Sequence, residues 1–283
     1  MTNKTSYIKV KDHSVTGEEF ELLYNEVYEM LETHPQPTKE NIGKYYQSED
    51  YISHTDAKRN LFERVYHLVR SIALKRKLKL INEESSDNKQ LLDIGCGTGD
   101  FLEVAKNDGW SVTGVEPNQM ARDIANSKTD QAVSDVTELD QLKSGHFDVI
   151  TLWHVLEHLH DLDDHIQRFN RLLKPSGTLI VAVPNFKSFD ASYYKSHWAA
   201  YDAPRHLWHF SKKSIDRLFV KVNFKIARVL PMKFDAYYVS LLSEKNKSGW
   251  MNLFNAFFVA SRSNLKAARS GEYSSLIYVL KKA

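Results

Sequence analysis

Apolar runs and helix-spaced apolar positions alternate through the middle of the chain, from about residue 90 to residue 185. Each short run is typical of a buried strand, and each three- and four-residue spacing is typical of an amphipathic helix. Alternating strands and helices form a parallel sheet with helices on both faces. We therefore expect an α/β, doubly wound core, with strands at 91–94, 111–115, 131–134, 147–152 and 177–183 and helices at 99–108, 118–126 and 162–173.

The flanking segments carry weaker patterns. Before the core, alternating positions predict small strands at 7–10 and 20–24, and Pro35 and Pro37 close that segment as a turn. Helical spacing predicts an amphipathic helix over 58–81, in which the basic run 75–79 is interpreted as a solvated face or a basic helix end. After the core, an aromatic-rich segment over 186–210 precedes a helix capped by Ser211, a strand at 224–231, an apolar helix at 250–269 and a strand at 274–280.

Composition narrows the class of protein. The 283 residues carry a formal net charge of only +2, which gives little support to nucleic acid as the main partner. Cys96 is the single cysteine, so no disulfide and no cysteine-based zinc site can form within the chain. The sequence shows neither a signal-peptide core nor a run long enough to span a membrane, and we interpret the protein as cytoplasmic.

A glycine turn follows the first core strand. Gly95, Gly97 and Gly99 stand between apolar Leu91–Ile94 and the start of a helix, where free backbone N–H groups suit a polar ligand. A dinucleotide fingerprint would require a third glycine at position 100, but the residue there is Asp100, whose carboxylate disfavours a pyrophosphate and hence a nicotinamide cofactor. A ligand with hydroxyls, an amino group and a positive charge fits this turn better.

Five ordered segments carry a family resemblance. The glycine turn, Asp93–Gly99, resembles the first motif of class I S-adenosylmethionine (SAM) methyltransferases of the small-molecule type, similar to the ubiquinone-biosynthesis methyltransferases. The other segments follow in the order of that family, at 114–117, 134–136, 147–158 and 172–180. The resemblance implies a Rossmann-like seven-stranded sheet with an antiparallel last strand, an N-terminal cap and C-terminal insertions. It also implies SAM as cofactor and S-adenosylhomocysteine (SAH) as product.

The cofactor site is predicted from this resemblance. Glu116 ends the second strand, where a carboxylate can accept hydrogen bonds from two ribose hydroxyls. Cys96 is interpreted as a small residue that fits the turn, although a reactive thiol is an alternative. Tyr46, Tyr51 and His54 belong to an aromatic segment that forms either a lid over SAM or a latch on the following helix. The remaining candidates are Asp93, Gly95, Gly97, Gly99, Phe101, Pro117, Asp135, Val136 and Trp153.

Methyl transfer needs alignment, exclusion of water and, for a hydroxyl acceptor, one base. The catalytic candidates are His206, His209, His154 and Arg205, since histidine titrates near neutral pH. His206 and His209 have a spacing that also resembles a metal-ligand pair. With no third ligand near them in sequence, we expect no metal. His158 is interpreted as a packed or capping residue.

The sequence thus predicts a SAM-dependent methyltransferase that methylates a small molecule at oxygen, with a histidine base. The alternatives are a non-catalytic SAM-fold binding protein and a methyltransferase acting on a macromolecule. The expected organisation is a small N-terminal segment or metal-free minidomain at 1–42, the aromatic lid and amphipathic helix at 43–89, the SAM-binding core at 90–185, and the acceptor-site segment and last strands at 186–283.

Overall fold

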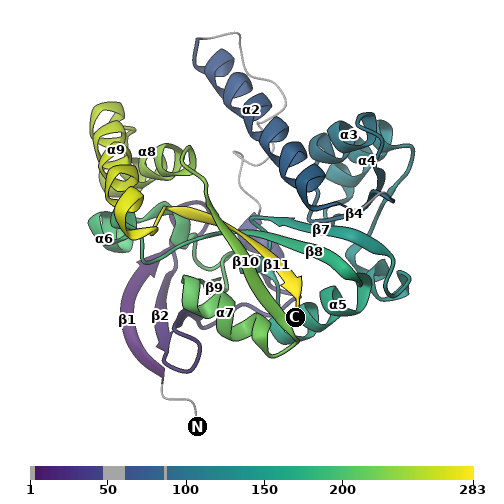
Figure 1. Cartoon of the computed structure of the whole chain (residues 1–283). Coiled ribbons are helices and arrows are strands. Elements are labelled where there is room, and N and C mark those ends of the chain that lie inside the picture. Colours follow the sequence, from purple (N-terminus) through teal and green to yellow (C-terminus); the bar gives the residue numbers. More distant parts are fainter. Residues whose placement is uncertain (1–3, 47–60, 86–87) are drawn as a thin grey trace.

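We describe a computed structural model of the chain, covering residues 4–46, 61–85 and 88–283, with the backbone alone for 61–68. The candidates Tyr51 and His54 lie outside the described residues. Two sheets organise the chain (Figure 1). The larger has seven strands and the smaller has four.

The seven-stranded sheet has the order β10-β11-β8-β7-β4-β5-β6. β4 lies between β7 and β5, so the chain order reverses there, and ligands of such sheets bind at the carboxyl ends of the strands beside this point. β11 is antiparallel to both β8 and β10, which confirms the predicted antiparallel last strand. The strands are β4 (Gln90–Ile94), β5 (Ser111–Val115), β6 (Val133–Ser134), β7 (Phe147–Trp153), β8 (Leu173–Pro184), β10 (Phe224–Pro231) and β11 (Ser275–Lys282).

Apolar side chains cover both faces of this sheet. Neighbouring residues of one strand point to opposite faces, so Leu91 and Leu92 of β4 belong to two different hydrophobic clusters. Phe169 packs in the cluster of Leu92, and Phe101 packs in the cluster of Leu91. The predicted doubly wound core is therefore confirmed. Its helices are α2 (Leu61–Glu84), α3 (Asp100–Asn107), α4 (Gln119–Thr129), α5 (Leu162–Leu172) and α7 (Lys212–Val220), the last capped by Ser211 as predicted.

The smaller sheet joins the N-terminal segment to the segment after the core. β1 (Lys4–Lys11) and β2 (Glu19–Asn25) contain the predicted small strands, and β3 (Met30–His34) was not predicted because its buried residues do not alternate. The fourth strand is β9 (Trp208–His209), which pairs with β3 from the far end of the chain. The sheet thus fixes the aromatic segment 186–210 in place.

Three helices complete the C-terminal part. α6 (Phe189–Tyr194), α8 (Asp235–Ser248) and α9 (Leu253–Ser270) gather at the end of the molecule next to β1 and β2 (Figure 1). α9 confirms the predicted apolar helix, although it begins three residues later, after Asn252 caps its N-terminus. α8 was not predicted. Short 3-10 helices occupy 42–46, 136–141, 156–158, 195–197 and 199–201.

Thr33 ties β3 to the segment that leads into β9, within the smaller sheet, and provides a test of this arrangement. Its hydroxyl donates to the His206 carbonyl at 2.6 Å and lies 3.0 Å from His209 Nε2, and its side chain is buried. Thr33→Val leaves both partners without that bond, so we expect urea unfolding to show a loss of about 1–3 kcal/mol. Thr5→Val, on the exposed face of β1, should change stability little. An equal effect of the two variants would contradict the assigned role.

Candidate active site

The glycine turn packs closely against its surroundings. Gly95 and Gly99 have φ values of 67° and 77°, which side-chain-bearing residues rarely adopt. A Cβ on Gly95 would lie 2.5 Å from Val155 Cγ2, and a Cβ on Gly99 would lie 2.8 Å from Ala125 Cβ. Gly97 instead faces open space, with no atom within 4 Å of a Cβ built there. Gly95 and Gly99 therefore allow the turn to pack closely on its neighbours. Gly97, between them, leaves the surface of the turn open to a ligand.

The Glu116 carboxylate holds this turn from the end of β5. Glu116 Oε2 accepts from the Gly97 backbone N–H at 2.9 Å, and Oε1 accepts from the Asn118 N–H at 3.0 Å. Each oxygen retains a further lone pair that can accept from a ligand hydroxyl. The side chain is 7% exposed and lies beside the open face of Gly97. This geometry fits the predicted ribose role.

Arg122 of α4 links the loop that follows β5 to the loop that follows β6. Its Nη1 donates to the carbonyls of Glu116 and Pro117 and forms an ion pair with Asp135 Oδ2 at 2.7 Å. Asp135 also caps the turn that begins at half-buried Val136. The backbone N–H of Thr137 and the charge of Arg122 hold the pKa of Asp135 below its usual value, against the opposing effect of burial. Arg122 thus holds the predicted adenine-side residue Asp135 next to the loop of Glu116 and Pro117.

Asp93 lies buried beneath the turn and accepts from the Thr151 hydroxyl at 2.6 Å. Burial raises the pKa of Asp93 to about 7, although the Thr151 hydrogen bond and the Lys77 charge oppose this rise. Burial also lowers the pKa of Lys77, whose ammonium from α2 approaches the same region. A cationic ligand at this end of the site would favour ionised Asp93.

Aromatic rings and the cysteine line the same region. Phe101 and Trp153 meet edge to face with ring centroids 5.7 Å apart, and Lys77 Nζ lies 4.4 Å from the Trp153 ring centroid. Cys96 turns inward, since its Sγ would be 2.9 Å from a Cβ on Gly114. Burial raises the pKa of the Cys96 thiol far above its usual value, so the group is neutral. These contacts support the interpretation of Cys96 as a packing residue.

His154 lies between two acids just past β7. Its Nε2 is 3.0 Å from Asp235 Oδ2 at the start of α8, and its Nδ1 is 3.4 Å from Glu157 Oε1. Burial would lower the pKa of His154, but its bonds to Asp235 and Glu157 outweigh that effect and raise the pKa to about 10. At neutral pH His154 is therefore an imidazolium and cannot accept a proton.

Glu157, His158 and His206 form a cluster whose ligand atoms lie within 4.8 Å of one another. His158 Nδ1 and His206 Nδ1 lie 3.0 Å and 2.9 Å from the carbonyls of Arg205 and Ala200. Because a carbonyl only accepts, each Nδ1 carries the proton and each Nε2 keeps its lone pair. Glu157 is 1% exposed, its Oε1 has only the 3.4 Å ion pair with His154, and its Oε2 has no hydrogen-bond partner among the described residues.

This donor set fits a divalent cation. Two imidazole nitrogens and a carboxylate suit zinc, iron or cobalt, and Nδ1–H donation to a carbonyl is the usual way to orient a ligating histidine. The bonds and charges of His154 and His206 hold the pKa of Glu157 below its usual value despite burial, so the carboxylate is ionised. The two other members of the cluster, Glu157 and His158, come from the turn after β7, and His209, the expected partner of His206, is not among them.

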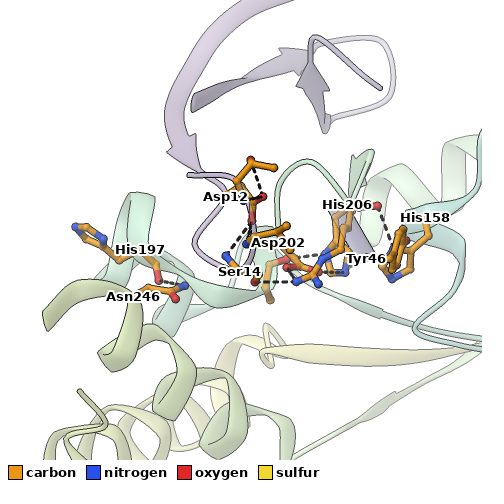
Figure 2. Close-up of polar contacts among 12 residues, drawn as sticks. Asp12, Ser14, Tyr46, His158, His197, Asp202, His206 and Asn246 are labelled. Atoms are coloured by element: carbon orange, nitrogen blue, oxygen red, sulfur yellow. Dashed lines mark hydrogen bonds and ion pairs between the residues drawn. The ribbon is translucent and has the colours of Figure 1, made fainter. Parts of the chain in front are cut away.

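Figure 2 shows the polar network that supports this cluster. The Tyr46 hydroxyl lies 3.0 Å from His158 Nδ1, which places Tyr46 beside the histidines. Arg205 pairs with Asp202 and donates to the Ser14 hydroxyl, and Asp202 Oδ2 is 3.8 Å from His206 Nε2.

His209 is separated from this group by its role in the smaller sheet. Its ring packs edge to face on Tyr201, and its Nε2 bonds Thr33. Burial, together with the charge of His206, holds the pKa of His209 well below its usual value, so the ring is neutral. The structure therefore brings His154 and His206 near the carboxyl end of β7, with Arg205 beside His206, and places His209 behind them.

Four residues with a place in the site were not assigned one from the sequence: Lys77, Glu157, His158 and Asp235. Lys77 belongs to the basic run 75–79, whose composition resembles an ordinary solvated helix face. Glu157 stands in the segment His154–His158, where three titratable residues within five positions were a usable signal. Asp235 gave no signal, because only folding brings α8 to His154.

The sheet order, the closely packed glycine turn and Glu116 after β5 are together the features of a class I SAM-dependent methyltransferase. A family profile described as "Methyltransferase domain" matches residues 63–229, more than half of the chain. The chain therefore belongs to this methyltransferase family, whose cofactor is SAM.

A curated relative agrees with this assignment. The ubiquinone biosynthesis O-methyltransferase of Coxiella burnetii is 30% identical over 142 residues, which cover 48% of this chain and 58% of the relative. The chain thus spans little more than half the length of that relative.

Solved structures show the same fold. A SAM-dependent methyltransferase from Archaeoglobus fulgidus superposes with a TM-score of 0.52 at 18% identity, over 75% of this chain and 94% of that one. Geranyl diphosphate C-methyltransferase from Streptomyces coelicolor, solved with Mg²⁺, a substrate analogue and SAH, gives 0.51 at 17% identity over 74% and 76%. Within the described part of this chain, no helix combines the length and apolar character that a bilayer crossing requires.

Glu116→Gln tests the cofactor site. The amide keeps the shape of the side chain but removes the charge and places an NH₂ group against a backbone N–H. Calorimetric titration should show SAH binding weakened by about 1.5–3 kcal/mol. Asp123→Asn on the exposed face of α4 is the matched control and should bind like the wild type. Unchanged SAH affinity in Glu116→Gln would contradict the ribose role.

Titration with Co²⁺ tests the cation site through visible absorption of the bound ion. We expect saturable binding by the wild type and at least about tenfold weaker binding by Glu157→Gln and by His206→Gln, since each loses a ligand. His146→Gln, at the opposite end of β7, is the control. Absence of saturable binding, or binding that neither ligand variant weakens, would show that the cluster is not a cation site.

Proposed function

We propose that the protein transfers the methyl group of SAM to a hydroxyl oxygen of a small molecule. Family membership supports the reaction class, and the name of the Coxiella relative supports an oxygen acceptor. The near-neutral charge favours a small acceptor over a nucleic acid. The observation that carries the proposal is the close packing of the glycine turn on the turn after β7, through Gly95 and Val155.

The contact between Gly95 and Val155 brings the residues proposed to bind the cofactor next to those proposed to face the acceptor. On one side, Glu116 and the open face of Gly97 bind and orient the cofactor, which supplies an activated methyl group when bound. On the other side, Trp153 and His154 face the region where an acceptor would enter. Alignment of two bound reactants supplies most of what such a transfer requires. Lys77 lies over the Trp153 ring, and Asp235 at the start of α8 contacts His154, so both elements border this region.

His206 is the base that we assign among the four catalytic candidates. Its Nδ1–H donates to the Ala200 carbonyl, so its Nε2 lone pair can accept the acceptor's hydroxyl proton. Asp202, 3.8 Å from that nitrogen, would stabilise the resulting imidazolium. His154 is already protonated and instead offers positive charge to a developing oxyanion. Arg205 positions Asp202 and Tyr46.

A cation on Glu157, His158 and His206 is a second way to activate the hydroxyl. It would lower the pKa of a bound hydroxyl and make a separate base unnecessary. The buried Glu157 carboxylate favours this alternative, because its Oε2 has no partner among the described residues and its Oε1 has only the 3.4 Å ion pair with His154. A chelator that abolishes turnover without affecting SAH binding would select it, whereas turnover that a chelator leaves unchanged would select His206 as base.

His206→Gln tests the assignment of the hydroxyl-activating group. We expect turnover to fall by about 10²–10⁴-fold with little change in SAH affinity, because the residue acts on the acceptor and not on the cofactor. The assay measures SAH formation over a panel of phenols, catechols and hydroxylated quinones. His146→Gln is again the control.

Two results would overturn the proposal. If His206→Gln turns over like the wild type, His206 does not activate the acceptor. If the wild type binds SAH but forms no product with any acceptor of the panel, the non-catalytic alternative is favoured. NADH serves as the control ligand in the binding experiment and should not bind.

A further inference from the structure

The outward face of α9 is strongly apolar. Phe254 is 92% exposed and Leu265 is 73% exposed, and Phe257 and Phe258 are also exposed. Because successive helix residues are about 100° apart, Phe254, Phe258 and Leu265 lie within about 40° of one another around the helix axis. Trp250, also exposed, extends this apolar stripe into the loop between α8 and α9.

Basic residues border the stripe. Arg262, Lys266 and Arg269 are exposed and lie between the apolar stripe and the buried face of α9, which contains Ala256 and Ala260. Lys266 Nζ lies 4.0 Å from the Phe189 ring centroid of α6. The α8–α9 hairpin, residues 233–271, contains six basic residues, and all of them are exposed: Lys233, Lys245, Lys247, Arg262, Lys266 and Arg269.

The two acids of the hairpin point inward. Asp235 faces His154 in the active site. Glu244 is 3% exposed and bonds Asn255. Every exposed charged residue of 233–271 is therefore a cation.

A basic groove adjoins this face. It has a volume of about 760 Å³ and lies between α9 and the segment of Lys187 and Phe189. Lys187, Arg262, Lys266 and Arg269 line it, and its one acid, Glu272, is paired with Lys212 at 2.8 Å. Such a groove suits a phosphate-bearing headgroup.

We propose that the α8–α9 hairpin docks on an anionic phospholipid surface, with the apolar stripe in the acyl boundary and the cations among the headgroups. Apolar and basic residues in this order around a helix are the pattern of an interfacial amphipathic helix. A second copy of the chain fits less well, because a twofold contact would bring the same six cations together. Anionic lipid supplies both the apolar phase and the complementary charge.

Docking would also act on the site. α8 spans about 20 Å, and its first residue, Asp235, contacts His154 while its last turn leads to the apolar loop. If the hairpin is held at a membrane, the start of α8, which contacts His154, is held near that membrane as well. This surface inference does not depend on the proposed reaction, since lipid binding is measured without turnover.

Vesicle sedimentation of the full chain tests the proposal. We expect binding to vesicles of mixed phosphatidylcholine and phosphatidylglycerol, weaker binding to phosphatidylcholine alone, and weakening by salt. Phe254→Ser with Phe258→Ser should reduce vesicle binding at least about tenfold, because the inserted apolar area is lost. Arg262→Glu with Lys266→Glu should abolish the preference for phosphatidylglycerol.

A matched control replaces exposed apolar residues elsewhere. Val27→Ser with Val220→Ser should bind vesicles like the wild type, since neither residue belongs to the hairpin. Each variant should retain SAH binding and a cooperative melt. The fluorescence of Trp250, taken as the difference between the wild type and Trp250→Phe, should shift to the blue with phosphatidylglycerol vesicles.

Three results would overturn the inference. The first is the absence of binding to phosphatidylglycerol vesicles. The second is binding that the Phe254 and Phe258 replacements leave unchanged. The third is a concentration-dependent dimer, seen by sedimentation velocity, that the same replacements dissociate, because the face would then be an interface between copies of the chain.

Discussion

The close approach of Gly95 to Val155 is the contact on which the site depends. Only a residue without a Cβ lets the turn after β4 lie directly against the turn after β7. The first turn carries the proposed cofactor-binding surface, where Glu116 accepts from the Gly97 N–H, and the second carries His154, Glu157 and His158. A side chain at Gly95 would separate these two turns. The proposed site therefore rests on close backbone packing.

Burial and neighbouring charges determine which titratable groups of the site are ionised and which are neutral. Glu157 is an ionised acid in the interior, and imidazolium His154 balances it from one side. His158 is neutral because burial and the neighbouring His206 lower its pKa to about 4. A neutral imidazole is the form that can ligate a cation or accept a proton. The turn after β7 therefore contains a positive charge on His154 and a neutral imidazole on His158.

The N-terminal and C-terminal parts both act on this site from outside the sheet. β3 pairs with β9, and the Thr33 bonds hold the backbone of His206 in place. α8 brings Asp235 to His154. Both parts are distant from the core in sequence, yet each contacts a histidine at the carboxyl end of β7. Both flanking parts therefore help to shape the proposed acceptor side of the site.

By itself, the sequence determined the sheet core, the cofactor turn and the family, because apolar periodicity and the glycine spacing are local properties. It did not indicate β3, whose buried residues include Glu32 and Thr33, or α8, whose apolar residues do not form one stripe. It also indicated His206 and His209 equally as candidates for the catalytic base. Only the tertiary structure separated them, by placing His209 against Thr33 and His206 against Glu157. That choice depends on contacts between segments about 50 and 170 residues apart, which no local pattern encodes.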